Sequence, residues 1–205
     1  MAKLNIAPTK SSLLSLKRQL AFAEEGYDLL EQKRQILIFE LMSRLNRARD
    51  VENRIAEAFK RAFAALREAE LDVGSEALDR AALNVQMDHQ VVLSDQHLMG
   101  MKIPQVTVRA EPVSAQFGVT GTSANTDLTL RRFVEALPLL AELAELENAV
   151  LRLARELRKT QRRCNALSKL FIPDYRETIG YITGSLEERE RESFVILKTI
   201  RDRLA

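Results

Sequence analysis

Residues that interrupt helices are concentrated in one short part of this chain. The chain has seven glycines and five prolines, and six of these twelve residues lie between Gly74 and Gly121. The long segments on either side contain few such residues, which predicts two long helices joined by a short middle segment. The 205 residues include no tryptophan and only 5% aromatics, as is typical of long helices rather than of a compact mixed core.

The first long segment carries the apolar repeat of a coiled coil. From Thr9 to about Leu71, apolar residues recur in alternating steps of three and four, which predicts one helix with a buried seam and Thr9 as its N-cap. Between Leu37 and Ala48 an extra step of four forms a stutter, which locally unwinds a supercoil. The seam positions are Leu13, Leu16, Leu20, Ala23, Tyr27, Leu30, Leu37, Leu41, Leu45, Ala48, Ile55, Phe59, Ala62, Leu66 and Ala69.

The second long segment repeats the pattern more regularly and contains one exception, Pro173. Asp127 is the predicted N-cap of this helix. Pro173 removes a backbone donor and crowds the carbonyl of Lys169, a cost of about 3 kcal/mol inside a helix, so we expect a bend there. The seam positions are Leu139, Leu143, Leu146, Val150, Leu153, Leu157, Thr160, Cys164, Leu167 and Phe171, then Ile179, Ile182, Leu186, Leu197, Ile200 and Leu204.

The middle segment is long enough to let one chain pair both of its own seams. The predicted fold is therefore mainly α: a long antiparallel two-helix coiled coil with a small middle head, although a parallel dimer is an alternative. In the head, "GSEALDRAAL" predicts a short helix capped by Ser75, and "NVQMDHQVVL" and "KIPQVTVRA" predict a β-hairpin around "LMGMK". The predicted divisions are an N-terminal arm, 1–71, a head, 72–126, and a C-terminal arm, 127–205.

Catalytic and cofactor motifs are missing from the sequence. It has no Gly-rich phosphate loop, H-E-x-x-H, cysteine pair or nucleophile elbow, so no catalytic residue and no cofactor is predicted. His89 and His97 have only Asp88 and Asp95 as further candidate ligands, which favours surface histidines over a metal site. Cys164 falls on the seam, which favours a buried packing residue over a reactive thiol.

Charge and hydropathy exclude two further classes of protein. The net charge is +2, from 31 basic and 29 acidic residues, which gives no field strong enough to predict nucleic-acid or membrane affinity. No stretch resembles a signal peptide or a membrane-spanning helix, and the single cysteine needs no oxidising compartment. We therefore expect a soluble, cytoplasmic protein that reaches a membrane only through partners, without direct insertion.

Basic residues gather along both arms. A pairing that sets Arg47 beside Arg158 brings two basic stretches to one height, where an acidic partner or the solvent must relieve their repulsion. Partner binding and simple solvation are equally good interpretations, while nucleic acid is disfavoured because no aromatic residues are interleaved for stacking. This basic collar consists of Arg44, Arg47, Arg49, Arg152, Arg155, Arg158, Lys159, Arg162 and Arg163.

The pairing of the arms that sets Arg47 beside Arg158 also brings three helical glycines together. Gly26, Gly180 and Gly184 share a height, and each costs about 1 kcal/mol relative to alanine inside a helix. A close approach of the two arms explains them, and coincidence is an equally good interpretation.

Three stretches of sequence resemble one known family. "PTKSSLLSLKRQLAFAEEGYDLLEQKRQILIFELM", residues 8–42, resembles the N-terminal signature of the D subunits of V-type and A-type rotary ATPases. "RRCNALSKLFIPDYRETIGYITGSLEERERESFVILKTI", residues 162–200, is similar to the C-terminal signature of that family, and "GMKIPQV", residues 100–106, to its middle segment. The three stretches follow one another in the family's order, which a generic coiled coil would not reproduce.

The resemblance implies a non-catalytic central rotor shaft. In the family, the termini enter a ring of catalytic and regulatory A and B subunits, an F subunit binds the shaft, and the head faces a membrane-rotor adapter. Such a shaft couples ATP turnover to rotation of a membrane ring that moves protons or sodium ions. By family position, contacts with the catalytic ring fall on Pro8, Thr9, Lys10, Lys17, Arg18, Lys198, Arg201 and Arg203.

Two other functions compete with this interpretation. A free-standing coiled-coil adapter would bind partners through the basic collar without any ATPase. The γ subunit of F-type ATPases also pairs terminal helices, but it needs a far larger middle than 72–126 provides.

Overall fold

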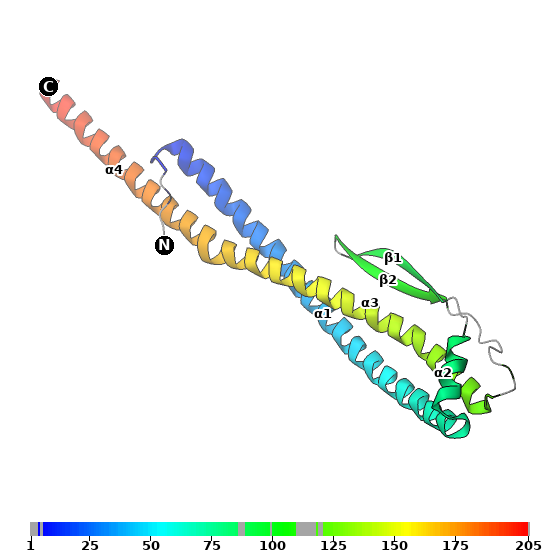
Figure 1. Ribbon diagram of the computed structural model, residues 1–205. Coiled ribbons are helices and arrows are strands. Elements are labelled where there is room, and N and C mark those ends of the chain that lie inside the picture. Colours follow the sequence, from blue (N-terminus) through cyan, green and yellow to red (C-terminus); the bar gives the residue numbers. More distant parts are fainter. Residues whose placement is uncertain are drawn as a thin grey trace. The chain divides into compact units, whose positions relative to one another are not determined.

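A computed structural model of the chain describes residues 4, 6–85, 89–98, 100–109, 118 and 121–204. The predicted mainly α fold with antiparallel helical arms and a β-hairpin is confirmed (Figure 1). The elements are α1 (Lys10–Val73), α2 (Ser75–Leu83), β1 (Gln90–Leu98), β2 (Met101–Arg109), α3 (Ala124–Ala166), a short π-helix η1 (Leu167–Phe171) and α4 (Ile172–Leu204). The chain divides into a terminal unit, Met1–Ile38 with Glu156–Ala205, and a central unit, Phe39–Arg155.

The core of the central unit forms where α1 packs against α3. Val51 and Ile55 of α1 are buried with Leu146 of α3, and Phe59 and Leu143 pack against them. Most of these side chains were predicted seam positions, although Val51 was not. Six further buried positions of this seam carry alanine, and small side chains permit a short distance between helix axes. These are Ala62, Ala65, Ala69, Ala136, Ala141 and Ala149.

The seam of the terminal unit joins α1 to α3 and α4 and contains larger and more polar residues. Leu16 and Leu37 of α1 are 2% and 0% exposed, and Thr160, Cys164 and Ile182 of the opposite helices are equally buried, at 0% to 2% exposed. Polar pairs join these antiparallel helices beside the seam. Arg34 Nη1 donates to Gln161 Oε1 at 2.8 Å, and Arg176 Nη2 donates to Glu24 Oε1 at 2.6 Å.

The π-helix η1 shifts the seam by one residue. Phe171, a predicted seam position, is 49% exposed, whereas Ile172 is 8% exposed. The prediction for Phe171 was wrong because the Ile172 N–H donates to the Leu167 carbonyl, an i→i−5 bond that adds one residue to the turn. Pro173 follows at once, where the i→i−4 ladder is already interrupted. Figure 1 shows the ribbon changing direction where η1 joins α4.

Of the three N-cap residues that the sequence predicted, the structure confirms one. Thr9 is confirmed, because its Oγ1 accepts the Ser12 N–H at 3.1 Å. The prediction of Asp127 was wrong: α3 starts at Ala124, and the Thr126 hydroxyl accepts the Ser123 N–H at 3.3 Å. The prediction of Ser75 was also wrong, since Gly74 precedes α2 and no side chain caps it.

The hairpin has continuous antiparallel pairing. Its register runs from Gln90 opposite Arg109 to Leu98 opposite Met101, without a bulge. Gly100, in the turn, has a φ of 80°, a conformation that favours glycine.

The end of α4 lies beyond the start of α1. Lys10, the first residue of α1, forms an ion pair with Glu190, and every later residue of α4 whose side chain is described is exposed (Figure 1). Leu197 and Ile200 are 61% and 49% exposed, so their predicted seam contacts were wrong within this chain: α1 does not extend alongside them. The side chain of Leu204 lies outside the described set.

Of the two interpretations of the three helical glycines, the close approach of the arms was wrong. A Cβ added at Gly26, Gly180 or Gly184 would meet no atom within 4 Å. Packing between the helices therefore does not require glycine at these positions.

Candidate functional surfaces

The N-terminal residues assigned by family position lie where α1 starts against α4. Lys10 Nζ is 2.8 Å from Glu190 Oε1, and the hydrogen bond and charge of this carboxylate raise the pKa of Lys10. Lys10 and Lys17 line an open groove of about 360 Å³. Its other lining residues are Leu13, Leu14, Thr183, Leu186, Glu187 and Glu190. Pro8 is held beside α4, since its carbonyl accepts a bond from Arg189 Nη1 at 3.1 Å, and Thr9 caps α1.

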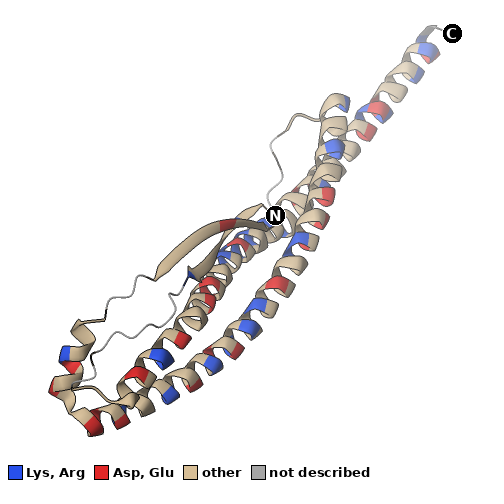
Figure 2. Cartoon of the chain, turned by 90° about the vertical axis from the view of Figure 1, so that its right-hand side faces the viewer, with Lys and Arg blue, Asp and Glu red and all other residues tan. Residues whose placement is uncertain are grey.

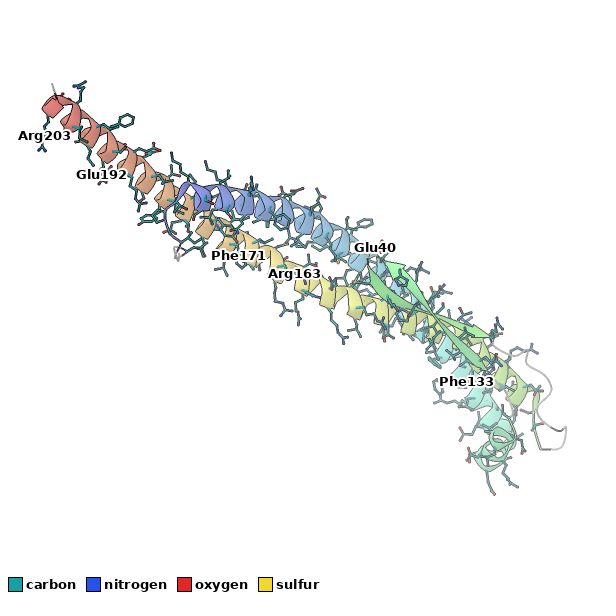
Figure 3. All side chains as sticks on the ribbon, turned by 90° about the horizontal axis from the view of Figure 1, so that it is seen from above. Glu40, Phe133, Arg163, Phe171, Glu192 and Arg203 are labelled. Carbon is teal, nitrogen blue, oxygen red and sulfur yellow. The ribbon has the colours of Figure 1, made fainter. Side chains whose placement is uncertain are left out.

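The remaining residues assigned by family position are exposed. Arg18 projects from α1, and Lys198, Arg201 and Arg203 lie on the exposed end of α4, with Arg201 Nη2 2.8 Å from Asp202 (Figure 3). The same end carries an exposed apolar run that the seam interpretation did not separate from the core. Its members are Phe194, Val195, Ile196 and Leu197, at 58% to 71% exposed. Four consecutive apolar residues cannot all face one helical seam, which was the available signal.

The predicted alignment of the basic collar was wrong. Arg47 Nη2 is 3.3 Å from Glu142 Oε1 within the central unit, whereas the predicted pairing gave Arg47 a basic neighbour on the second arm. Arg44 Nε contacts Glu40 of its own helix at 3.4 Å, and Arg49 is exposed. Acidic side chains therefore accompany the first basic stretch. Figure 2 shows acidic and basic residues interspersed along the helices.

The basic residues of the collar on α3 have fewer acidic neighbours than those on α1. Glu156, the one acidic residue within this stretch, is 3.3 Å from Lys33 of α1, so its charge is already compensated. Among the described residues, no ion pair neutralises the exposed cations Arg155, Arg158, Lys159, Arg162 and Arg163. Figure 3 shows Arg163 directed away from α1. Arg152 is engaged differently, with Nη1 donating to the Lys102 carbonyl of β2 at 2.5 Å.

A stripe of exposed apolar side chains on α1 was not foreseen. Phe22, Leu29 and Ile36 are 78%, 60% and 46% exposed and recur every seven residues. Residues with this spacing share one helix face, so the terminal unit presents a second apolar line besides its buried seam. The leucine repeat of the buried seam is the more regular of the two, which is why periodicity alone did not reveal this second line.

A polar cluster lies beside the seam of the terminal unit. Arg34 pairs with Glu31 and Gln161, although its buried Nε has no partner among the described residues. Burial, followed by the charge of Glu31, raises the pKa of Cys164, and the charge of Arg34 opposes this. Cys164 is 2% exposed, in agreement with a packing role.

The histidines do not form part of a metal site in the described part of the chain. His89 precedes β1 and His97 lies within it, and no three potential ligands among the described residues converge. Asp88, one of the further ligands considered, lies outside those residues.

An apolar pocket of about 220 Å³ opens in the central unit, where α2 crosses the ends of α1 and α3. Leu66, Leu78, Leu130 and Phe133 are among its lining residues, and Phe133 also contacts the ring of Phe63 edge-on at 5.4 Å between centroids. Among the helices of the described chain, none contains a stretch with the length and hydropathy of a membrane span.

Comparison with known proteins gives one consistent family. The family of ATP synthase D subunits matches residues 12–202. The V-type ATP synthase D subunit of Thermotoga neapolitana is 35% identical over 202 residues, covering 98% of this chain and 100% of that protein. The A-type ATP synthase D subunit of Methanosphaera stadtmanae is 39% identical, covering 96% and 93% of the two chains, and that of Thermococcus sibiricus is 38% identical, covering 97% and 94%.

Proposed function

The chain belongs to the family of ATP synthase D subunits of V-type and A-type ATPases, and on that premise we propose that it is the central rotor shaft of such a complex. It hydrolyses nothing itself. It couples ATP hydrolysis or synthesis in a surrounding head of A and B subunits to rotation of a membrane ring that carries protons or sodium ions.

The paired helices in each unit carry this proposal. A single helix twists and bends easily, whereas two helices joined by side chains in contact must break packing to do so. The buried seam of the terminal unit and the Val51–Ile55–Leu146 cluster of the central unit supply such packing. Both units therefore have the stiffness that torque transmission needs.

We assign the bend of the shaft to Pro173 together with η1. A straight, symmetric rod presents the same face to every catalytic site of a ring, so a shaft that holds the sites in different states must be uneven. Prolines and π-turns are established causes of helix kinks. Pro173→Ala should stabilise the isolated chain and impair coupling in the assembled complex.

A one-residue deletion distinguishes the contribution of the π-turn to the bend from that of the proline, because it removes the π-turn and keeps Pro173. Removing Ser168 returns the seam to an unbroken heptad, because Ile172 then takes the place that Phe171 was predicted to fill. The deletion should leave a folded, paired chain with reduced coupling between ATP turnover and ion transport. Normal coupling in both this deletion and Pro173→Ala would contradict the assignment of the bend.

The proposed partners divide along the chain. The A and B subunits contact the start of α1 and the end of α4, where Lys10, Lys17, Arg18, Lys198, Arg201 and Arg203 lie. The membrane-rotor adapter binds the head, where the apolar pocket at Leu78 and Phe133 supplies a hydrophobic surface. The F subunit binds the collar on α3.

Reconstitution tests the proposed function. The chain and its F partner are added to a purified head of A and B subunits, and assembly and sustained ATP hydrolysis are followed. Incorporation of one copy per head with altered turnover is expected. Failure to associate, under conditions in which an established shaft protein does associate, would favour the alternative adapter function.

The collar has its own charge-reversal test. Arg155→Glu combined with Arg158→Glu should weaken capture of the F subunit, because both cations are exposed and without an ion pair in the described chain. Arg61→Glu combined with Arg67→Glu, an equal charge change on exposed positions of α1, is the matched control. Equal F binding by the two double variants would remove the collar from the account.

A further inference from the structure

The outer edge of strand β2 is closed by other parts of the central unit. The Val106 N–H donates to Glu145 Oε2 at 2.9 Å, and the Lys102 carbonyl accepts from Arg152 Nη1 at 2.5 Å. Both groups point away from β1 toward α3. Backbone groups of alternate residues in an antiparallel strand point to the same side, so Pro104 occupies the outward position between them and has no N–H to offer.

The same register defines the outer edge of β1. Residues opposite one another in a non-hydrogen-bonded pair both direct their backbone groups outward. Leu93, Asp95 and His97 lie opposite Val106, Pro104 and Lys102, so their N–H and carbonyl groups point away from the hairpin. Val91 follows by the same alternation. Within the described residues of 39–155, no group bonds to these outward backbone groups.

Strand β1 has few of the usual protections of an edge, since Asp95 is its one charged residue. Native edge strands are commonly interrupted by proline, lysine or a bulge, which prevents pairing with other chains. β1 has none of these, and its residues up to His97 are all exposed. Val91 and Leu93, on one face, are 60% and 69% exposed. The β1 edge is therefore open where the β2 edge is closed.

We propose that β1 binds an extended segment of another rotor subunit by strand addition, forming a three-stranded sheet; this inference rests on the proposed shaft function. Strand addition makes several directional backbone hydrogen bonds and fixes one register. Such a ladder would have to break at every step against a stationary ring. It persists only with a partner that rotates together with the shaft.

The chemistry of the edge specifies the bound segment. Apolar side chains of the segment pack on the face that carries Val91 and Leu93. A basic side chain lies beside Asp95, which is exposed and makes no hydrogen bond or ion pair with any described residue. The partner strand is therefore extended, alternately apolar, and basic at one position.

Hydrogen exchange of the unmodified protein tests the proposal directly. In the isolated chain, the outward amides of Leu93, Asp95 and His97 should exchange quickly, and the inward amides of Val92 and Ser94 slowly. In the assembled rotor, without the A and B subunits, exchange at the outward amides should slow by about tenfold or more. Unchanged exchange there, in a rotor that assembles and turns, would overturn the inference and leave the shaft function standing.

A proline substitution provides the second test. Leu93→Pro removes an outward donor at a position equivalent to that of Pro104 on β2, and should weaken rotor assembly at least about tenfold. Leu93→Ile keeps both the N–H and the apolar side chain and should bind nearly as well as the original chain. Slow exchange at Val92 and Ser94 checks that the variant hairpin is intact. Equal assembly by the two variants would contradict strand addition at β1. If the isolated chain self-associates and Leu93→Pro abolishes this, the strand that pairs with β1 comes from a second copy of the chain and not from another rotor subunit. Protection that appears only when the A and B subunits are present would contradict a partner that rotates with the shaft. A chain that enters no rotor at all would overturn both this inference and the shaft function.

Discussion

The terminal and central units pair the same two antiparallel segments of chain but fill the contact differently. Among the described residues, the central unit buries seven alanines and the terminal unit only Ala23. The central unit also buries Val51, Ile55, Leu146 and Leu153, and its buried threonines, Thr126 and Thr129, lie in the first turns of α3. The terminal seam has leucine and isoleucine in place of most of these alanines, and it carries Thr160, Thr178 and Cys164 along its length. A substitution at a buried alanine can remove little side-chain volume, and a close contact between helices leaves little space for a larger side chain. Larger and polar ones make the terminal seam sensitive to cavities and to lost hydrogen bonds.

The largest expected effect is a cavity in the terminal unit. Leu37→Ala removes a side chain that is 0% exposed and should lower the free energy of unfolding by about 2–5 kcal/mol. Denaturant unfolding monitored by circular dichroism measures it. Leu29→Ala, on the exposed stripe at 60% exposure, is the control and should change stability little. Equal losses from both substitutions would break the assignment of the seam.

The reverse substitution probes the central unit. Ala62 is 0% exposed between α1 and α3, so Ala62→Leu should cost about 1–3 kcal/mol by overpacking. The neighbouring exposed Ala64, changed to leucine, supplies the control in thermal unfolding. If Ala62→Leu stabilised the chain, the alanine contact would be loosely packed and the contrast between the units would fail.

A smaller effect is expected from the polar seam. The Thr178 hydroxyl donates to the Asp174 carbonyl at 2.7 Å and accepts the Leu4 N–H at 3.2 Å. Thr178→Val keeps the shape but leaves the Leu4 N–H without its partner, at a cost of about 1 kcal/mol. Thr199→Val is a matched control, because Thr199 makes the same bond within α4, to Val195 at 2.8 Å, and no other in the described chain. Hydrogen exchange at Leu4 should accelerate only in Thr178→Val.

The smallest effect has the opposite sign. Gly180→Ala should stabilise the terminal unit by about 1 kcal/mol or less, because the added Cβ meets nothing and alanine is the better helix former. Gly100→Ala should instead destabilise the hairpin, since its φ of 80° disfavours a side chain. A loss of stability in Gly180→Ala, seen as a lower thermal midpoint, would indicate a close approach at that height after all.

The sequence predicted the helical arms and the hairpin because burial imposes periodicity. Its errors have specific physical causes. The predicted seam stepped by eight residues from Phe171 to Ile179 instead of the seven of a heptad. The additional residue is the one that the π-helix η1 inserts, but periodicity alone does not show at which turn of the helix it is inserted. The pairing of Arg47 was misplaced because the connection between the arms, rather than either repeat, sets their axial alignment.

The candidate surfaces were less predictable than the fold. Exposed side chains have no packing constraint, so the repeat contains no information about Lys198 or the collar, and their assignment came from family resemblance and charge. The open β1 edge required the observed register, since only the bonds made by Lys102 and Val106 reveal which backbone groups point outward.

Rotation of this chain inside its complex is the decisive observation for the proposed shaft function. Cysteine introduced at exposed Glu76 of α2 takes a bead, and the native Cys164, 2% exposed, should remain unlabelled. With the A and B subunits fixed to a surface, the account predicts that the bead turns in one direction when ATP is added and stops when ATP is removed. Continued ATP hydrolysis around a stationary bead on an assembled complex would contradict it.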